Sequence, residues 1–108
     1  MYKLCFFVPQ SHLESVKSAV FEAGAGRMGD YDSCCWQVMG MGQFRPLKGA
    51  DPHIGNVGEL EYVDEWRVET LCTVEVIKNV VKALRAAHPY EEPAFDVWAL
   101  TQELMMDI

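Results

Sequence analysis

The sequence predicts an α+β sandwich, in which two helices pack on one face of a four-stranded antiparallel sheet. Two observations lead to this class. Four segments have the short apolar or alternating patterns of strands, and apolar residues recur at helical spacing in two others. The chain has 108 residues, of which 50% are hydrophobic and 23% charged, as in folded globular domains. We therefore expect a single domain over residues 1–108, with residues 102–108 as a C-terminal tail.

The first two predicted elements are a strand over residues 2–8 and a helix over residues 11–23. The strand is apolar on both faces, as central strands buried on both sides are, and Pro9 ends it. Ser11 and Glu14 have the spacing of a capping box, in which each side chain satisfies a backbone N–H at the start of a helix. Gly24 suits the left-handed residue that closes a helix.

The middle of the chain predicts two strands joined by a long excursion. Residues 34–44 form the first of these strands, and Gly40 and Gly42 within it suggest a bulge or the close approach of another backbone. The excursion over residues 45–58 is rich in Pro and Gly, and loops of this length inside compact domains usually have a function. Residues 59–71 alternate polar and apolar side chains, which predicts a half-buried antiparallel strand.

A second helix and a fourth strand complete the pattern. Thr73 is the predicted helix cap, and the helix ends at His88, because Pro89 restricts the residue before it. Residues 94–100 are apolar on both faces and predict the last strand. The elements follow one another along the chain as strand, helix, strand, strand, helix, strand, which is the succession of a ferredoxin-like βαββαβ sandwich. For this fold we expect the strands to lie side by side in the order 4-1-3-2.

The predicted sheet has one face without helical cover. Phe7 and Trp98 would lie in an apolar patch there, and large exposed patches usually mark interfaces. We therefore expect a homo-oligomer, most plausibly a ring with the open faces turned inward. The alternative is that the excursion over residues 45–58 and the tail residues Met105 and Met106 cover this face within one chain.

Charge and composition exclude several classes of partner. The formal net charge of −7 disfavours both nucleic acid and anionic membrane surfaces, which attract basic proteins. No segment reaches the roughly 20 apolar residues of a membrane span, and the first residues do not predict a signal peptide. The lack of an export signal and the adjacent positions of Cys34 and Cys35 indicate reduced thiols, and the absence of Cys-x-x-Cys spacing disfavours a zinc site. We expect a cytoplasmic protein.

The segment from His88 to Pro93 is the best candidate for chemistry. It places one His, one Tyr and two Glu between two prolines, which hold the turn rigid. His88 could be a protonated residue at a helix end, or a metal ligand with Glu91 or Glu92. It could also be a capping residue beside two solvated acids. Nothing in the spacing of His12 and His53 ties them to His88, and we expect scattered surface histidines.

Several motifs together resemble the PII-like domain found inserted in proteins of the Nif-three-like family, often called YqfO. They are AGAGRMGDYDSCCW, GQFRPLKGADPHIG, GELEYVDEWRVET and HPYEEPAFDVWAL, and the similarity runs over residues 2–101. HPYEEP is also similar to a turn of CutA, the divalent-cation-tolerance protein. The resemblance implies a ferredoxin-like fold and a trimer. PII proteins themselves are signal transducers that bind small effectors in clefts between subunits.

The resemblance does not extend to the metal-binding core that flanks this domain in full-length Nif-three-like proteins. That core has no counterpart in the present sequence, so its dinuclear-metal chemistry is not carried over. The similarity to CutA implies His88 as a copper ligand. The long effector loop of PII, with its modified Tyr, has no clear counterpart.

Our leading hypothesis is a non-enzymatic, trimeric PII/CutA-like regulatory module that binds a small-molecule effector or a protein partner. The alternative is a metal-tolerance protein that binds a divalent metal or copper through His88 and Glu92. A third hypothesis is an enzyme in which His88 is the acid or base and Glu91 or Glu92 orients it. No phosphate loop or other catalytic motif supports that third hypothesis. The predicted ligand-binding residues are His88, Tyr90, Glu91, Glu92 and Arg45.

Overall fold

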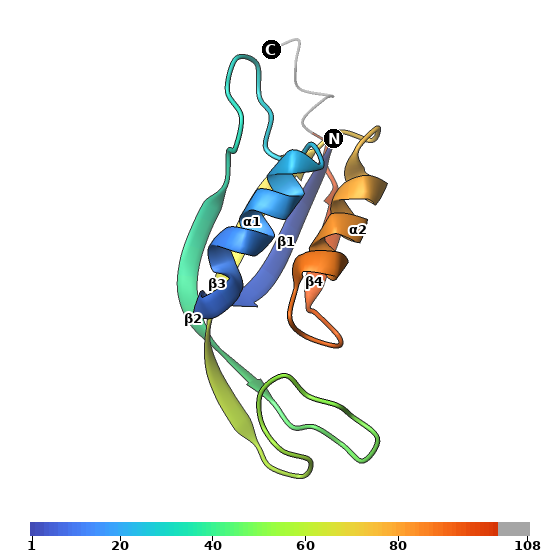
Figure 1. Ribbon diagram of the computed structural model, residues 1–108. Coiled ribbons are helices and arrows are strands. Elements are labelled where there is room, and N and C mark those ends of the chain that lie inside the picture. Colours follow the sequence, from blue (N-terminus) through green and yellow to red (C-terminus); the bar gives the residue numbers. More distant parts are fainter. Residues whose placement is uncertain (102–108) are drawn as a thin grey trace.

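The computed structural model describes residues 1–101 and confirms the predicted ferredoxin-like fold (Figure 1). Its four-stranded antiparallel sheet has the strand order β2-β3-β1-β4, which is the predicted order read from the other edge. The elements in chain order are β1 (Tyr2–Pro9), the short 3-10 helix η1 (Gln10–His12), α1 (Leu13–Glu22), β2 (Trp36–Phe44), β3 (Glu61–Cys72), α2 (Ile77–Ala87) and β4 (Phe95–Ala99).

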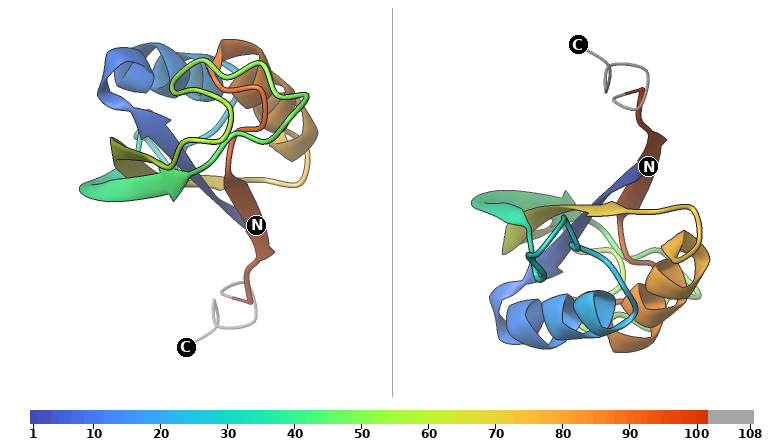
Figure 2. Two further views of the ribbon diagram at one scale, coloured as in Figure 1. Left: turned by 90° about the horizontal axis from the view of Figure 1, so that it is seen from below. Right: turned by 90° about the horizontal axis from the view of Figure 1, so that it is seen from above.

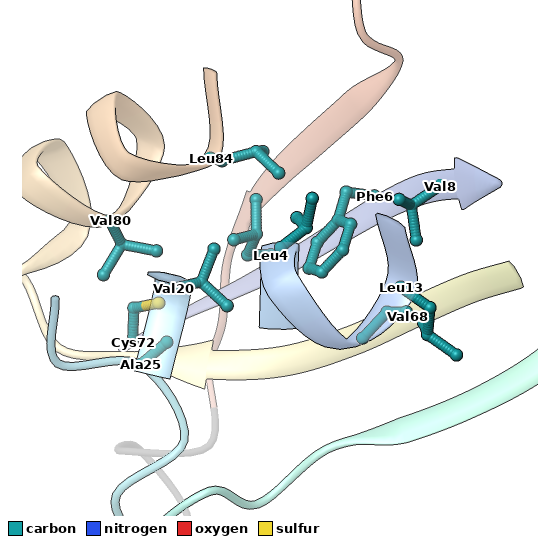
Figure 3. Packing of buried hydrophobic residues seen from close by; sticks show 11 residues of the cluster. Leu4, Phe6, Val8, Leu13, Val20, Ala25, Val68, Cys72, Val80 and Leu84 are labelled. Carbon is teal, nitrogen blue, oxygen red and sulfur yellow. The ribbon is translucent and has the colours of Figure 1, made fainter. Parts of the chain in front are cut away.

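Strand β1 is the centre of the structure, because it pairs with β3 on one side and with β4 on the other. Alternate side chains of a strand point to opposite faces, and those of Leu4, Phe6 and Val8 point to the helices, where they are fully buried (Figure 3). Val20 of α1 and Leu84 of α2 close over them. A core on the helical side of the sheet therefore holds the fold together.

Both helices begin later than the sequence predicts. Ser11 does not cap α1, because its hydroxyl lies 2.8 Å from Nδ1 of His12, and the helix has no side-chain cap at its N-terminus. Thr73 does not cap α2 either. Its carbonyl instead accepts the N–H groups of Val76 and Ile77, so residues 73–76 form a turn and the helix begins at Ile77. Backbone hydrogen bonds of the turns thus replace the predicted side-chain caps.

Strands β2 and β3 form a long hairpin that extends beyond the helices (Figure 1). The predicted alternation holds in β3, where Val68, Thr70 and Cys72 point into the core. The pairing of β2 with β3 runs without a bulge. Gly42 does meet a close approach, but from the side chain of Glu65, which fills the space that a Cβ atom would take. The predicted close approach is therefore that of a carboxylate and not that of a backbone.

The second face of the sheet has no helix on it (Figure 2). Trp36 is 59% exposed and Trp98 is 43% exposed, and both lie on this face by their register. Between them Lys3 pairs with Glu69 at 3.5 Å. The loop over residues 45–60 lies on the helical side and leaves Trp36 and Trp98 uncovered. It does line a cavity together with Phe7, so the alternative considered above holds only at that end of the strand. The tail residues of that alternative lie outside the described residues.

Within residues 1–101 no helix is both long enough and apolar enough to cross a membrane. The four cysteines are free. Cys5 and Cys72 are buried, Cys34 is half-buried and Cys35 is exposed. Burial raises the pKa of the Cys72 thiol to about 11, so this thiol is a packing residue of the core.

Candidate functional site

A cavity of about 380 Å³ lies where the long loop over residues 45–60 folds back against the turn between α2 and β4. Figure 2 (left) shows this loop, in green, lying beside the orange turn. The backbone N–H of Asp51 donates to the Glu91 carboxylate at 3.3 Å and so joins the loop to the turn. The cavity walls come from β1, the end of β2, the loop, β3 and the turn: Phe7, Gln43, Phe44, Arg45, Pro46, Leu47, Ala50, Pro52, His53, Ile54, Glu65, Tyr90, Glu91, Glu92 and Ala94.

Tyr90 is the residue that connects these walls. The centre of its ring lies 6.2 Å from that of Phe44, 6.3 Å from that of His53 and 4.9 Å from that of His88. Centroid separations of this size are those at which aromatic rings attract one another. Tyr90 therefore joins the hairpin, the long loop and the end of α2 into one aromatic wall.

His88 lies beneath that wall and is 6% exposed. Its Nε2 lies 2.7 Å from the carbonyl oxygen of Phe7, and its Nδ1 lies 3.1 Å from the backbone nitrogen of Tyr90. A carbonyl can only accept and an amide N–H can only donate. Nε2 therefore carries the proton, Nδ1 accepts, and the ring is neutral. Neither ring nitrogen has a free lone pair in this arrangement.

The pKa of His88 lies below its ordinary value. Burial is the largest cause, because it disfavours the charged ring. The hydrogen bond to the Phe7 carbonyl opposes this decrease in the pKa, whereas electrostatic interaction with the nearby His12 and His53 side chains adds to it. A neutral His88 is thus the form that the fold stabilises, and it fixes the backbone at Tyr90 in place.

Glu65 and Tyr90 meet at the base of the cavity. The Tyr90 hydroxyl is buried and lies beside the Glu65 carboxylate. Burial, and then the charge of the nearby Glu65 carboxylate, raises the pKa of Tyr90 above its usual range. The same carboxylate lies over Gly42. It therefore stands at a defined place in the wall, beside an aromatic ring.

The three histidines lie in one region, which corrects the expectation that they are scattered: the rings of His53 and His88 lie near that of Tyr90, and His12 contacts His53. The ring centres of His12 and His53 lie 5.5 Å apart, at nearly a right angle. No group of three His, Cys, Asp or Glu side chains with the geometry to hold a metal ion occurs among residues 1–101. The pairing of His88 and Glu92 as metal ligands stays a prediction, and the engaged ring nitrogens of His88 do not favour it.

Four of the five predicted ligand-binding residues line the cavity, namely Arg45, Tyr90, Glu91 and Glu92. His88, the fifth, supports the wall from below and does not line it. Sequence reasoning missed Phe7, Phe44, His53 and Glu65 as parts of the site. The apolar second face of the first strand was a signal for Phe7, the predicted function of the long loop was a signal for Phe44 and His53, and the row of acids along the third strand was a signal for Glu65.

No family model matches the chain, but individual proteins do. It is 53% identical over 98 residues to the GTP cyclohydrolase 1 type 2 homolog of Mycobacterium tuberculosis, a match that covers 91% of this chain and 26% of that protein. The Bacillus subtilis protein of the same name is 46% identical over 100 residues, covering 93% of this chain and 27% of the relative. The chain therefore spans about a quarter of the length of these relatives.

Solved structures agree with the sequence matches. A Bacillus cereus protein related to NIF3 has 41% identity and a TM-score of 0.79, over 93% of this chain and 25% of that one. The PII-like protein CutA from Nostoc sp. PCC 7120 has 18% identity and a TM-score of 0.69, over 96% of this chain and 85% of that one. At that identity the second match bears on the fold alone.

Proposed function

We propose that the chain is a PII-like, non-enzymatic module that binds a small-molecule effector. Its similarity over nearly its whole described length to part of a NIF3-related protein, and its fold, shared with the PII-like protein CutA, support the proposal. The cavity beneath the loop over residues 45–60 is the proposed site. The observation that carries the proposal is the cavity itself: about 380 Å³, walled by apolar side chains with a few polar groups among them.

The size and lining of this cavity are those of small-molecule sites. Such sites usually measure roughly 300–1,000 Å³ and combine apolar walls with a few placed polar groups. Phe44, Leu47 and Ile54 supply apolar surface, and Arg45 and Glu92 supply polar groups. One wall of the cavity is a loop, so a bound effector would change the position of that loop. Such a change is a simple basis for regulation.

The proposal of a non-enzymatic role rests on His88. A general acid or base needs a ring nitrogen that can reach a substrate, and both nitrogens of His88 are held by backbone groups. The name GTP cyclohydrolase 1 type 2 homolog belongs to relatives of which this chain matches only about a quarter. Any share in such an activity is a separate proposal, which the geometry of this cavity does not carry.

We also propose that the protein is a cytoplasmic homo-oligomer, with a trimer as the expected form. The support is the open face of the sheet, where Trp36 and Trp98 are exposed to solvent in a single chain. Burying aromatic surface of this kind drives association. A different protein bound to the same face would also bury these side chains. The mass of the protein alone in solution distinguishes a homo-oligomer from that alternative.

The test of effector binding is saturation-transfer NMR with a library of metabolite-sized compounds. A cavity-filling variant, Ala50→Trp, should abolish binding, because Ala50 lines the cavity. Ala86→Trp is the matched control, since Ala86 is an exposed residue of α2 that does not line the cavity. Compounds that bind the wild type and both variants alike would contradict the proposed site.

A further inference from the structure

We propose that the effector of this cavity carries a positively charged amine beside a flat apolar group, and that Glu65 pairs with that amine. The inference rests on the proposed function and adds the charge and shape of the ligand to it. Its grounds are the charges of the cavity walls, the fixed place of the Glu65 carboxylate beside Tyr90 and the aromatic rings of Phe44 and Tyr90 in the same cavity.

The walls carry more negative than positive charge. Three carboxylates line the cavity, those of Glu65, Glu91 and Glu92, against the one guanidinium of Arg45 and the imidazole of His53. Arg67, the other cation nearby, packs on the Phe7 ring at 5.9 Å and does not line the cavity. A carboxylate or phosphate ligand would meet like charges, which is unfavourable inside a partly enclosed site.

Glu65 is the carboxylate best placed to hold a charge. Glu91 already accepts a backbone N–H from the loop, and Glu92 is exposed. Glu65 is half-buried, and none of the described salt bridges of this chain includes it. Gly42 makes room for its carboxylate, and the buried Tyr90 hydroxyl lies close to it. An ammonium group at this point would gain an ion pair with little loss of side-chain freedom.

The rings beside Glu65 define the rest of the ligand. Phe44 and Tyr90 lie 6.2 Å apart with their planes tilted by 51°. The faces of aromatic rings attract cations and also pack against flat apolar groups. The same wall therefore favours the ammonium end and the apolar end of one molecule. This chemistry is that of arylalkyl amines.

The experiment compares three probes of nearly equal size: phenethylamine, hydrocinnamate and phenethyl alcohol. Their affinities for the wild type are measured by NMR titration at low salt, because ion pairs weaken in salt. Phenethylamine should bind about tenfold more tightly than hydrocinnamate, the factor expected for a charged hydrogen bond. Equal or tighter binding of hydrocinnamate would overturn the inference.

Two variants locate the effect at Glu65. In Glu65→Gln the preference for the amine should disappear, whereas Asp64→Asn, its neighbour on the other face of β3, should keep it. In Gly42→Ala the added methyl group displaces the Glu65 carboxylate, and the preference should also fall. Gly40→Ala is its control, because no atom lies within 4 Å of the added methyl group. Thermal melts check that each variant is folded.

The outcomes separate this inference from the proposed function. If all three probes bind in the cavity without preference, or if Glu65→Gln keeps the preference, the inference is wrong and the effector site stands. If no probe binds and the compound library also gives no ligand, both are wrong. A preference for the amine that is lost in Glu65→Gln and kept in Asp64→Asn supports both.

Discussion

Replacing His88 by Ala tests whether this residue holds the cavity wall in place. The substitution removes the hydrogen bond from Nε2 to the Phe7 carbonyl and the one from the Tyr90 N–H to Nδ1. Each such bond contributes on the order of 1 kcal/mol, and leaving a buried partner unsatisfied costs on the order of 1–3 kcal/mol. Loss of the buried ring adds a cavity penalty. We expect the free energy of unfolding to fall by about 2–4 kcal/mol.

The assay for His88→Ala is urea unfolding followed by circular dichroism, at one protein concentration because an oligomer's stability depends on concentration. His12→Ala is the matched control: it removes a less buried histidine from the same cluster and should cost less than about 1 kcal/mol. If His88→Ala were as stable as His12→Ala, the two hydrogen bonds of His88 would not support the turn, and the reasoning would be refuted.

Three other predictions concern pH, thiol reactivity and assembly. The pKa of His88 is lowered from 6.5 in the folded chain, so the unfolded chain binds a proton more readily and stability should fall as the pH drops below about 6.5. In urea unfolding between pH 7.5 and 5.5, the free energy of unfolding should fall less for His88→Gln than for the wild type. Equal falls in the two proteins would contradict this prediction. In the native protein, Ellman's reagent at pH 8 should modify the exposed Cys35 quickly. It should modify the buried Cys72, whose pKa is raised to about 11, only when the protein unfolds. Fast labelling of Cys72 would count against its burial. Trp36→Arg should lower the mass measured by light scattering to that of a monomer, since it places a charge on the open sheet face, and an unchanged mass would exclude that face as the interface.

Most of the fold follows from local patterns in the sequence. The strand around Phe6 is apolar on both faces, and the strand around Val68 alternates, so their places at the centre and beside the centre of the sheet were predictable. The start of α2 was not. Thr73 is of a type that favours the cap position. In the structure, however, residues 73–76 form a turn between the sheet and the helix, and α2 begins only at Ile77.

The candidate site was predictable only in part. The turn from His88 to Pro93 and the long loop could each be singled out as candidate site segments from their composition. Their contact could not, because it depends on how the hairpin directs the loop back over the turn, where Asp51 meets Glu91. His12 and His53 illustrate the same limit: they are far apart in the sequence and come together only through the tertiary fold.

The most direct test of the account is a map of amide chemical-shift changes, recorded while a compound that binds the wild type is titrated into the labelled protein. We predict that the changes concentrate on the loop over residues 45–60 and on the turn around Tyr90, the two walls of the cavity. Changes confined to the open face around Trp36, with none in the loop or the turn, would contradict the claim that this cavity is the binding site.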